Sequence, residues 1–316
     1  MTELLKTDVL TQILRIIPQR IRNPLRNALS GDYSDVHEVV LRAGKPVCVY
    51  KKGSLWYLTE NGCLTAQVDS QPLIASSFFE VTDCFNLACG HSVYSHISEI
   101  TEGFVTISGG HRVGLCGTAV ISEDKIINVR DISTISIRFS REIIGSGIKL
   151  AREISMLGKG VLICGSPCSG KTTVLRDIAR ELSDAYSYRV TIVDTRSEIA
   201  AAYHGLNQNN VGMCDVLNGF PRAEGIVQAV RTLSPEYIIC DEIGTERDAR
   251  ALTCGVNSGV VFVATMHAGN IEELRNRQAF CDIINTQAFS KIVFLSSRKS
   301  PGQVLKVMSR EEIMCG

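Results

Sequence analysis

The 316-residue chain has the length of about two ordinary domains, and its 45% hydrophobic and 21% charged residues predict a folded protein with a sizeable core. This composition excludes global disorder. Lysine plus arginine and aspartate plus glutamate number 33 each, so the net charge is zero and no overall basic field favours nucleic acid as a partner.

The twelve cysteines include no CxxC pair. The closest pairs, Cys84 with Cys89 and Cys164 with Cys168, lack the spacing of a zinc ribbon. Cys164 and Cys240 lie inside apolar runs, where a free thiol behaves as a small buried hydrophobe. We therefore expect a reducing cytosol, no disulfide framework and no cysteine-bound metal.

Residues 1–18 are amphipathic, with Leu10, Ile13, Leu14 and Ile17 at helical spacing. The pattern predicts a helix that packs on the protein, and a helix lying on a membrane surface is the second interpretation. We expect no signal peptide, and no uncharged apolar run approaches the roughly 18 residues of a membrane span. Any role at a membrane would then require a partner.

Short strand-like segments separated by turn signals such as ENG and GG fill most of the chain up to residue 140. The predicted strands cover residues 38–44, 46–53, 54–62, 103–110, 111–122, 126–131 and 134–140, and the predicted helices cover 74–89 and 93–100. We predict a smaller N-terminal α+β domain, residues 1–140, with a mostly antiparallel sheet.

From residue 141 the pattern changes to continuous apolar runs that alternate with helical segments, as in a parallel sheet buried on both faces. A junction loop and a helix over residues 143–160 lead into this region. The predicted strands cover residues 161–165, 189–194, 237–241, 260–265 and 291–295, and the predicted helices cover 171–183 and 223–233. We predict an α/β domain, residues 141–316, with a mostly parallel sheet and right-handed crossovers.

The sequence GSPCSGKT, residues 165–172, fits the phosphate-binding pattern GxxxxGK[ST] between a predicted strand and a predicted helix. Glycines let backbone N–H groups curl around a phosphate, and the helix N-terminus points its positive dipole end at the same group. Lys171 can reach the β- and γ-phosphate oxygens of ATP, and Thr172 can offer its hydroxyl to Mg²⁺. The predicted nucleotide-binding residues are Gly165, Ser166, Pro167, Cys168, Ser169, Gly170, Lys171, Thr172 and Thr173.

A buried strand that ends in Asp241 and Glu242 supplies the second part of the predicted site. Asp241 can hold Mg²⁺ through its water shell, and Glu242 can polarise the attacking water. A strand ending in solvated acids is the alternative interpretation. An acid directly after the magnesium-binding acid favours a hydrolysing ATPase over a kinase or a GTPase switch, and no guanine-reading NKxD motif is present.

Polar residues follow two further predicted strands, at the sheet edge where α/β proteins bind ligands. Asp194, Arg196 and Glu198 can face the nucleotide, although Arg196 and Glu198 can instead form a surface ion pair. His267 ends the strand after Asp241 and is placed to sense a γ-phosphate, although a single histidine is more often structural.

These motifs, in this order, resemble the family of stage III sporulation protein AA from endospore-forming bacteria. The resemblance extends from EVVLRAGKPV through GGHRVGLCGTAV and VDTRSEIAAAYHG to YIICDEIGTERDARAL and ATMHAG, over nearly the whole chain. The family in turn resembles the ATPases of type II and type IV secretion and of type IV pili. Those proteins are hexameric motors with an N-terminal α/β domain and a RecA-like domain. The resemblance implies that this chain, too, is an ATPase of the AAA+ class.

The resemblance implies a cytoplasmic ATPase, peripheral at the mother-cell membrane, that energises the channel joining mother cell to forespore. Membrane proteins of that channel are the implied partners. By position, residues 165–172 correspond to Walker A, residues 194–198 to the acidic box, Asp241 and Glu242 to Walker B, and His267 to the histidine box.

Two departures from the related patterns leave roles open. Secretion ATPases have Gly-Glu at Walker B where this chain has Asp241-Glu242, so either Glu242 or Glu198 can be the main base. The sporulation family usually has an acid at the position of Thr195. In the resembled motors, arginines from the N-terminal domain or from a neighbouring subunit of the hexamer complete the charge neutralisation of the γ-phosphate. Arg138 and Arg196 are therefore further catalytic candidates, and a surface ion pair is the alternative interpretation for each.

Two other functions compete with the channel motor. A nucleic-acid-dependent RecA-like ATPase is the main alternative, but Arg138, Arg141 and Arg152 are scattered and not clustered with aromatic residues. A nucleotide-gated scaffold that rarely hydrolyses is the third, and the Asp241-Glu242 pair argues against it.

Overall fold

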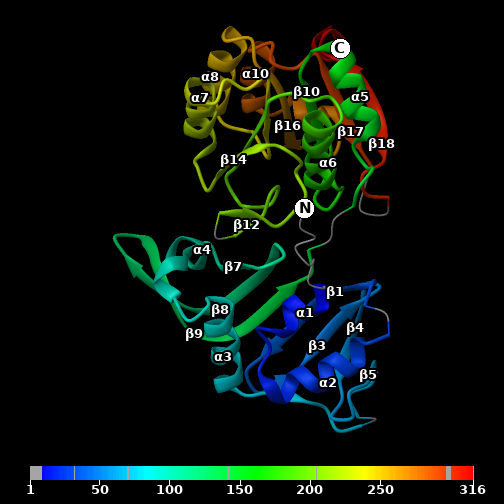
Figure 1. The fold of residues 1–316 in the computed structure, drawn as a ribbon, viewed down its shortest axis with the longest axis vertical. Helices are drawn as coiled ribbons and strands as arrows, with labels where there is room; N and C mark the ends of the chain where they lie inside the picture. The colour runs from blue at the N-terminus through cyan, green and yellow to red at the C-terminus, as the bar shows by residue number, and fades with distance from the viewer. Residues whose placement is uncertain are drawn as a thin grey trace. The chain divides into compact units, whose positions relative to one another are not determined.

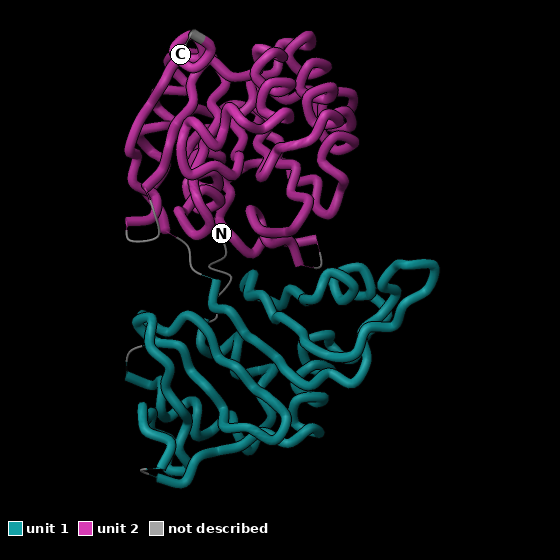
Figure 2. Tube along the Cα trace, turned by 180° about the vertical axis from the view of Figure 1, so that it is seen from behind, with its two compact units in different colours: residues 1–141 teal, residues 142–316 magenta. Residues whose placement is uncertain are grey.

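A computed structural model describes residues 9–31, 33–69, 71–140, 143–203, 205–296 and 300–315. The chain forms two compact units, residues 1–141 and residues 142–316, called unit 1 and unit 2 below (Figure 2). No helix of the described residues is long and apolar enough to cross a membrane.

Unit 1 contains a seven-stranded antiparallel sheet (Figure 1). In spatial order its strands are β5 (Leu64–Thr65), β4 (Ser54–Leu58), β3 (Cys48–Lys51), β1 (Val36–Arg42), β9 (Lys125–Arg138), β8 (His111–Ser122) and β7 (Phe104–Ile107). The short strands β2 (Lys45–Pro46) and β6 (Ala75–Ser76) pair separately. The helices are α1 (Val9–Leu14), α2 (Gln19–Leu29), α3 (Phe78–Ala88), the 3-10 turn η1 (Val93–His96) and α4 (Ile97–Thr101). The antiparallel prediction for this region is confirmed.

The predicted N-terminal helix is confirmed over Val9–Leu14 and ends before residue 18, and its first eight positions lie outside the described residues. Leu10, Ile13, Leu14 and Ile17 are all buried in the core of unit 1, so these residues pack on the protein and do not lie on a membrane. Helix α2 was not predicted. Its Ile21, Leu25 and Leu29 continue the same buried stripe.

Two boundaries in unit 1 differ from the prediction for local reasons. The strands expected at 126–131 and 134–140 are one strand, β9, because the positive φ of Asp131 absorbs an irregularity in the β8–β9 register without ending the pairing. The helix expected from residue 74 begins at Phe78, because Ser77 and Glu80 form a capping box while Ala75 and Ser76 pair with β2.

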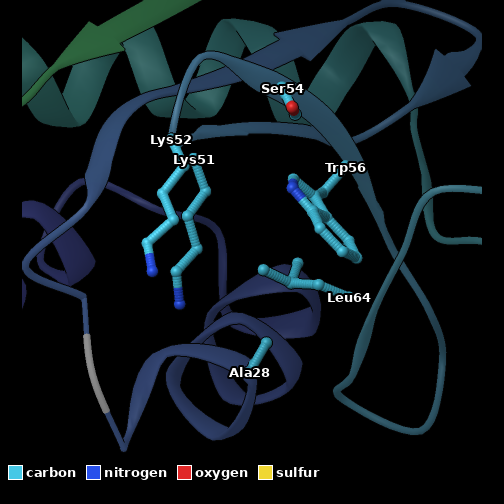
Figure 3. Close-up of a pocket in the computed structure, with 6 residues that line it drawn as sticks. All are labelled: Ala28, Lys51, Lys52, Ser54, Trp56 and Leu64. Atoms are coloured by element: carbon cyan, nitrogen blue, oxygen red, sulfur yellow. The ribbon is translucent and has the colours of Figure 1, made fainter.

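The only tryptophan of the chain, Trp56, lies beside a hollow of about 500 Å³ in unit 1. The hollow is lined by residues of α2, β3, β4 and β5, and Figure 3 shows Lys51 and Lys52 side by side opposite the Trp56 ring. Lys52 forms an ion pair with Asp35 at 3.2 Å. Because Trp56 is half-buried, its fluorescence reports the folding of unit 1.

Unit 2 contains a seven-stranded sheet in which every pair except β17–β18 is parallel. The order is β14 (Asp215–Asn218), β11 (Val190–Asp194), β15 (Tyr237–Cys240), β16 (Val261–His267), β10 (Val161–Gly165), β17 (Lys291–Leu295) and β18 (Val304–Ser309). A hairpin of β12 (Ala202–Tyr203) and β13 (Leu206–Asn207) stands apart. The predicted mostly parallel sheet is confirmed.

Helices cover both faces of this sheet (Figure 1). Alternate residues of β15 separate the two layers: Ile238 and Cys240 pack with α7 (Arg222–Thr232), α8 (Glu246–Asn257) and α10 (Gln278–Asn285), whereas Tyr237 and Ile239 pack with α5 (Ile148–Leu157) and α6 (Lys171–Asp184). Two short helices, α9 (Ile271–Arg275) and α11 (Arg310–Cys315), complete the unit. Cys164 and Cys240 are fully buried, as predicted.

His111 is a buried polar residue that ties three parts of unit 1 together. Its Nδ1 accepts a hydrogen bond from the backbone N–H of Ser140 at 3.0 Å, so Nε2 carries the proton and donates to Gln12 Oε1 at 3.0 Å. Both ring nitrogens are therefore used by the neutral imidazole. Burial lowers the pKa of His111 from 6.5 to about 4.

This lowered pKa predicts that unit 1 loses stability in mild acid. The unfolded chain takes up a proton below pH 6.5 and the folded chain does so only near pH 4, so the free energy of unfolding falls as the pH falls between these values. We expect a loss of about 2 kcal/mol between pH 7.5 and pH 5. Urea unfolding followed by Trp56 fluorescence measures it, and His111→Gln is the control. Equal pH dependence in wild type and His111→Gln would contradict the assignment.

Candidate functional site

The predicted site residues of unit 2 follow four strands that end at one edge of the sheet. The loop of residues 165–172, called the P-loop below, follows β10, and Gly165 is in register with His267 on the adjacent strand β16. Asp241 follows β15, the next strand, and residues 195–198 follow β11 beside it. Parallel order therefore brings together motifs that are up to about a hundred residues apart.

Backbone contacts hold the P-loop in shape. A side chain at Gly165 would collide with Ser169, and Gly170 has a φ of +88° that a residue with a side chain rarely adopts. The backbone N–H of Gly302 donates to Ser169 O at 2.8 Å, and a Cβ at Gly170 would lie 2.7 Å from that same nitrogen. The turn between β17 and β18 thus supports the P-loop, and the sequence analysis missed it although a Pro-Gly pair marks the turn.

Lys171 begins α6 and its side chain is buried. Its Nζ donates to the carbonyl oxygens of Gly165 at 2.9 Å and Ser166 at 3.0 Å, so the ammonium group lies over the P-loop. Burial lowers the pKa of Lys171, while the carboxylates of Asp241 and Glu242 act in the opposite direction. The charge is therefore held at the point where a bound nucleotide would present its phosphates.

The Asp241 carboxylate is the centre of a hydrogen-bonded group. Thr172 Oγ1 donates to Asp241 Oδ2 at 2.6 Å, Thr265 Oγ1 donates to Oδ1, and the backbone N–H of Glu242 reaches Oδ1 at 3.0 Å. Hydroxyl and carboxylate oxygens are the ligands that Mg²⁺ prefers, and these two residues can take an ion directly or through its waters. Thr172 and Asp241 thus fit a magnesium ion.

Glu242 and Arg196 form an ion pair across the site, with Arg196 Nη1 at 2.9 Å from Glu242 Oε2. The alternative interpretation of a surface ion pair between Arg196 and Glu198 is wrong in its partner. Arg196 pairs with Glu242 of the predicted Walker B motif. Both side chains are partly exposed, at 58% and 38%, so the pair contributes little to stability and can open readily. Glu242 itself has a positive φ of 51°.

Asp194 does not face the nucleotide, contrary to expectation. Its two carboxylate oxygens accept backbone N–H groups of Glu198, Ile199 and Ala200 at 2.9–3.1 Å, so it caps the loop that carries the acidic box. Burial raises the pKa of Asp194. On the other side of the loop, Arg176 of α6 donates to the carbonyls of Glu198 and Ile199 at 2.6 Å each. The backbone of Glu198 is therefore fixed, and its side chain is half-buried.

His267 ends β16 beside the first P-loop residue and is half-buried. Burial and the nearby charge of Lys171 both lower the pKa of His267, which favours the neutral ring. Glu273 and Arg277, which sequence reasoning missed, lie close enough to influence it and pair with each other at 2.5 Å. Arg138 ends β9 in unit 1, and its side chain is exposed. Its expected contact with a phosphate stays a prediction.

Because Gly170 lies so close to the backbone of Gly302, adding one methyl group at Gly170 should strongly weaken ATP binding. We expect Gly170→Ala to displace Gly302 or distort the P-loop and to weaken ATP binding at least about tenfold, because strain of this kind costs roughly 1–3 kcal/mol. Gly244→Ala is the matched control, since a Cβ there meets nothing within 4 Å. Titration with a fluorescent ATP analogue gives both affinities. Equal binding by wild type and Gly170→Ala would show that this approach is unimportant.

Several solved structures share the fold. The chain aligns with the Legionella pneumophila ATPase DotB at a TM-score of 0.56 and 17% identity, covering 95% of this chain and 86% of that one. It aligns with the pilus retraction motor PilT at a TM-score of 0.53 and 15% identity, covering 82% and 74%. The fold is therefore that of DotB and PilT, a RecA-like P-loop domain preceded by an N-terminal domain.

Sequence comparison is more specific. Stage III sporulation protein AA of Bacillus subtilis is 32% identical over 308 residues, which cover 96% of each chain. The family described as "Sporulation stage III, protein AA" matches residues 7–314. The chain therefore belongs to the stage III sporulation protein AA family.

Proposed function

We propose that this protein is a magnesium-dependent ATPase of the secretion type that serves the channel between mother cell and forespore. The observation that supports hydrolysis best is the hydrogen bond of 2.6 Å between Thr172 and Asp241, with the Lys171 ammonium over the adjacent P-loop. It joins the two motifs that a hydrolysing P-loop enzyme needs at one metal ion. Family membership supports the role in sporulation.

The chain's own residues divide the work in this proposal. P-loop N–H groups and Lys171 bind the β- and γ-phosphates, and Thr172 and Asp241 orient the metal ion. When bound, Mg²⁺ neutralises charge on the phosphate oxygens. The Glu242 carboxylate accepts a proton from water as the water oxygen bonds to the γ-phosphorus and the bond to the bridging oxygen of ADP breaks. The products are ADP and phosphate.

In the proposed reaction, Arg196 leaves its ion pair with Glu242 and binds the γ-phosphate. Its ion pair with Glu242 neutralises the proposed base, and an arriving γ-phosphate offers Arg196 a stronger, doubly charged partner. His267, neutral beside Gly165, can donate a hydrogen bond from its protonated ring nitrogen to the same phosphate. Glu198 is the alternative base, because the acidic-box loop that carries it is fixed at the same sheet edge.

The protein is proposed to act as a homo-hexamer at the cytoplasmic face of the mother-cell membrane, bound there by membrane proteins of the channel. Arg138 of a neighbouring subunit is the proposed further cation at the γ-phosphate. Fold likeness to DotB and PilT supports a motor of this general type. The exposed position of Arg138 at the end of β9 is compatible with a contact to another chain.

A direct ATPase measurement tests the proposal. We expect wild-type protein with Mg²⁺ to release phosphate from ATP, at a specific rate that rises with protein concentration if neighbours complete the site. Lys171→Ala should lose activity and ATP-analogue binding together, whereas Lys149→Ala, an exposed lysine of α5, should retain both. Activity that is unchanged in Lys171→Ala would refute the site. Stimulation by single-stranded DNA would favour the nucleic-acid-dependent alternative.

The identity of the base can be decided by two amide substitutions. Glu242→Gln keeps the shape of the side chain but cannot take a proton, so we expect normal ATP binding and hydrolysis slower by at least about 10²-fold. Single-turnover phosphate release measures the chemical step, and Glu198→Gln is the matched variant. Near-normal turnover in Glu242→Gln with loss in Glu198→Gln would reverse the two roles.

A further inference from the structure

A groove between α7 and α8, called the α7–α8 groove below, is not used by the proposed reaction. It has a volume of about 470 Å³, within the range of ligand-binding hollows. Its apolar part is formed by Ala223 and Val227 of α7 and Ala251 of α8. Because both alanines are small, the two helices leave a hollow wide enough to receive the side chains of another molecule.

Arginines line the rest of the groove. Arg231 of α7 and Arg247 of α8 are exposed, and within the part of the chain that the structure describes neither side chain has a hydrogen bond or an ion pair. Arg250 also lines the groove, but its charge is offset by Glu246 one turn earlier. Glu224 is the acid that lines it. The free charge at this apolar hollow is therefore positive.

The α7–α8 groove is connected to the candidate active site through a buried ion pair. Arg222 at the start of α7 contacts Asp248 of α8 at 3.2 Å, and the Asp248 side chain is 3% exposed. Asp248 also accepts the backbone N–H groups of Gly244 and Thr245, at 3.0 and 2.9 Å, and these residues lie two and three positions after Glu242. A molecule seated in the groove would thus rest on the two helices that hold the Walker B loop.

We propose that the α7–α8 groove binds an amphipathic segment of another protein in which apolar side chains are flanked by acidic ones. Apolar side chains would fill the space over Ala223, Val227 and Ala251, and carboxylates would pair with Arg231 and Arg247. Helices commonly pack a third helix into a groove of this kind. This interaction goes beyond ATP hydrolysis and does not depend on it.

The surface fits such a segment better than it fits a lipid bilayer or nucleic acid. No large apolar side chain of α7 or α8, both fully described, is among the exposed ones, so nothing on these helices would insert into a bilayer. The groove has no aromatic lining residue on which a base could stack, and two acids lie in or beside it.

Fluorescence anisotropy with the full-length protein and no nucleotide tests the proposal. The probe is a fluorescein-labelled helical peptide with leucines spaced three and four residues apart and glutamates beside them, and a second peptide has lysines in place of the glutamates. We expect the acidic peptide to bind saturably and the basic peptide to bind at least about tenfold more weakly. Lys171→Ala should bind like wild type, so failure of the ATPase proposal and failure of this one are distinguishable.

Reversing the charge of the two groove arginines tests whether they bind the acidic peptide. We expect Arg231→Glu with Arg247→Glu to weaken binding of the acidic peptide about tenfold or more and to gain binding of the basic peptide, which also shows that the variant is folded. Lys149→Glu with Arg152→Glu makes the same change in net charge on exposed positions of α5 and should leave both affinities unchanged.

Two outcomes would overturn the proposal: the absence of saturable binding of the acidic peptide, and equal binding by wild type and the Arg231/Arg247 variant. If the peptide does not bind, the same charge reversal shows what the two arginines contact. Loss of binding to phosphatidylglycerol vesicles would then assign the arginines to a membrane surface, and a changed mass by light scattering would assign them to contacts between copies of this chain.

Discussion

The arrangement of the candidate site depends on the carboxylate of Asp241. This group accepts hydrogen bonds from Thr172 at the start of α6, from Thr265 on β16 and from the N–H of Glu242. Strand β16 lies between β15 and β10, so the bond to Thr172 spans an intervening strand and ties the P-loop helix to the Walker B strand. A carboxylate whose two oxygens accept from three donors is a strong, well-oriented acceptor, and it fixes the relative positions of the P-loop helix and the residues that follow β15.

Around this centre, the loops of the site are held mainly by backbone contacts. The turn containing Gly302 supports the P-loop, and Asp194 and Arg176 hold the acidic-box loop from opposite sides. Asp248 does the same for the residues after Glu242. Such a site is preorganised, because its charges need little rearrangement when a nucleotide arrives. The exposed side chains of Arg196 and Glu242, by contrast, are free to exchange partners.

The buried Arg222–Asp248 pair extends this network away from the nucleotide. Removing one member would leave an uncompensated charge in a nearly dry position, which is much more costly than losing a surface pair. The pair also keeps the first turns of α7 and α8 together, so a force applied to either helix reaches the residues that follow Glu242. This is a physical route by which the proposed partner segment, bound between α7 and α8, would influence the proposed ATP hydrolysis.

The sequence by itself determined the features that depend on local pattern. Apolar runs located β10, β11, β15, β16 and β17 because both faces of these strands are buried, and GSPCSGKT identified the P-loop because its glycines have a backbone requirement. Edge strands β14 and β18 escaped prediction because they are short or exposed and lack a continuous apolar run. Helix α8 was not predicted, although the capping box of Thr245 and Asp248 at its start is a local sequence signal.

Only the tertiary structure decided which polar groups meet. Asp194 ends β11 and Asp241 directly follows β15, yet Asp194 accepts hydrogen bonds from the backbone of its own loop, whereas Asp241 accepts one from Thr172 across the sheet. Arg196 pairs with Glu242, 46 residues away, and not with the nearby Glu198. The turn at Gly302 supports a loop more than a hundred residues earlier. Sequence spacing contains no information on such pairs, because the strand order of the sheet, and not the order along the chain, determines which strand ends are neighbours.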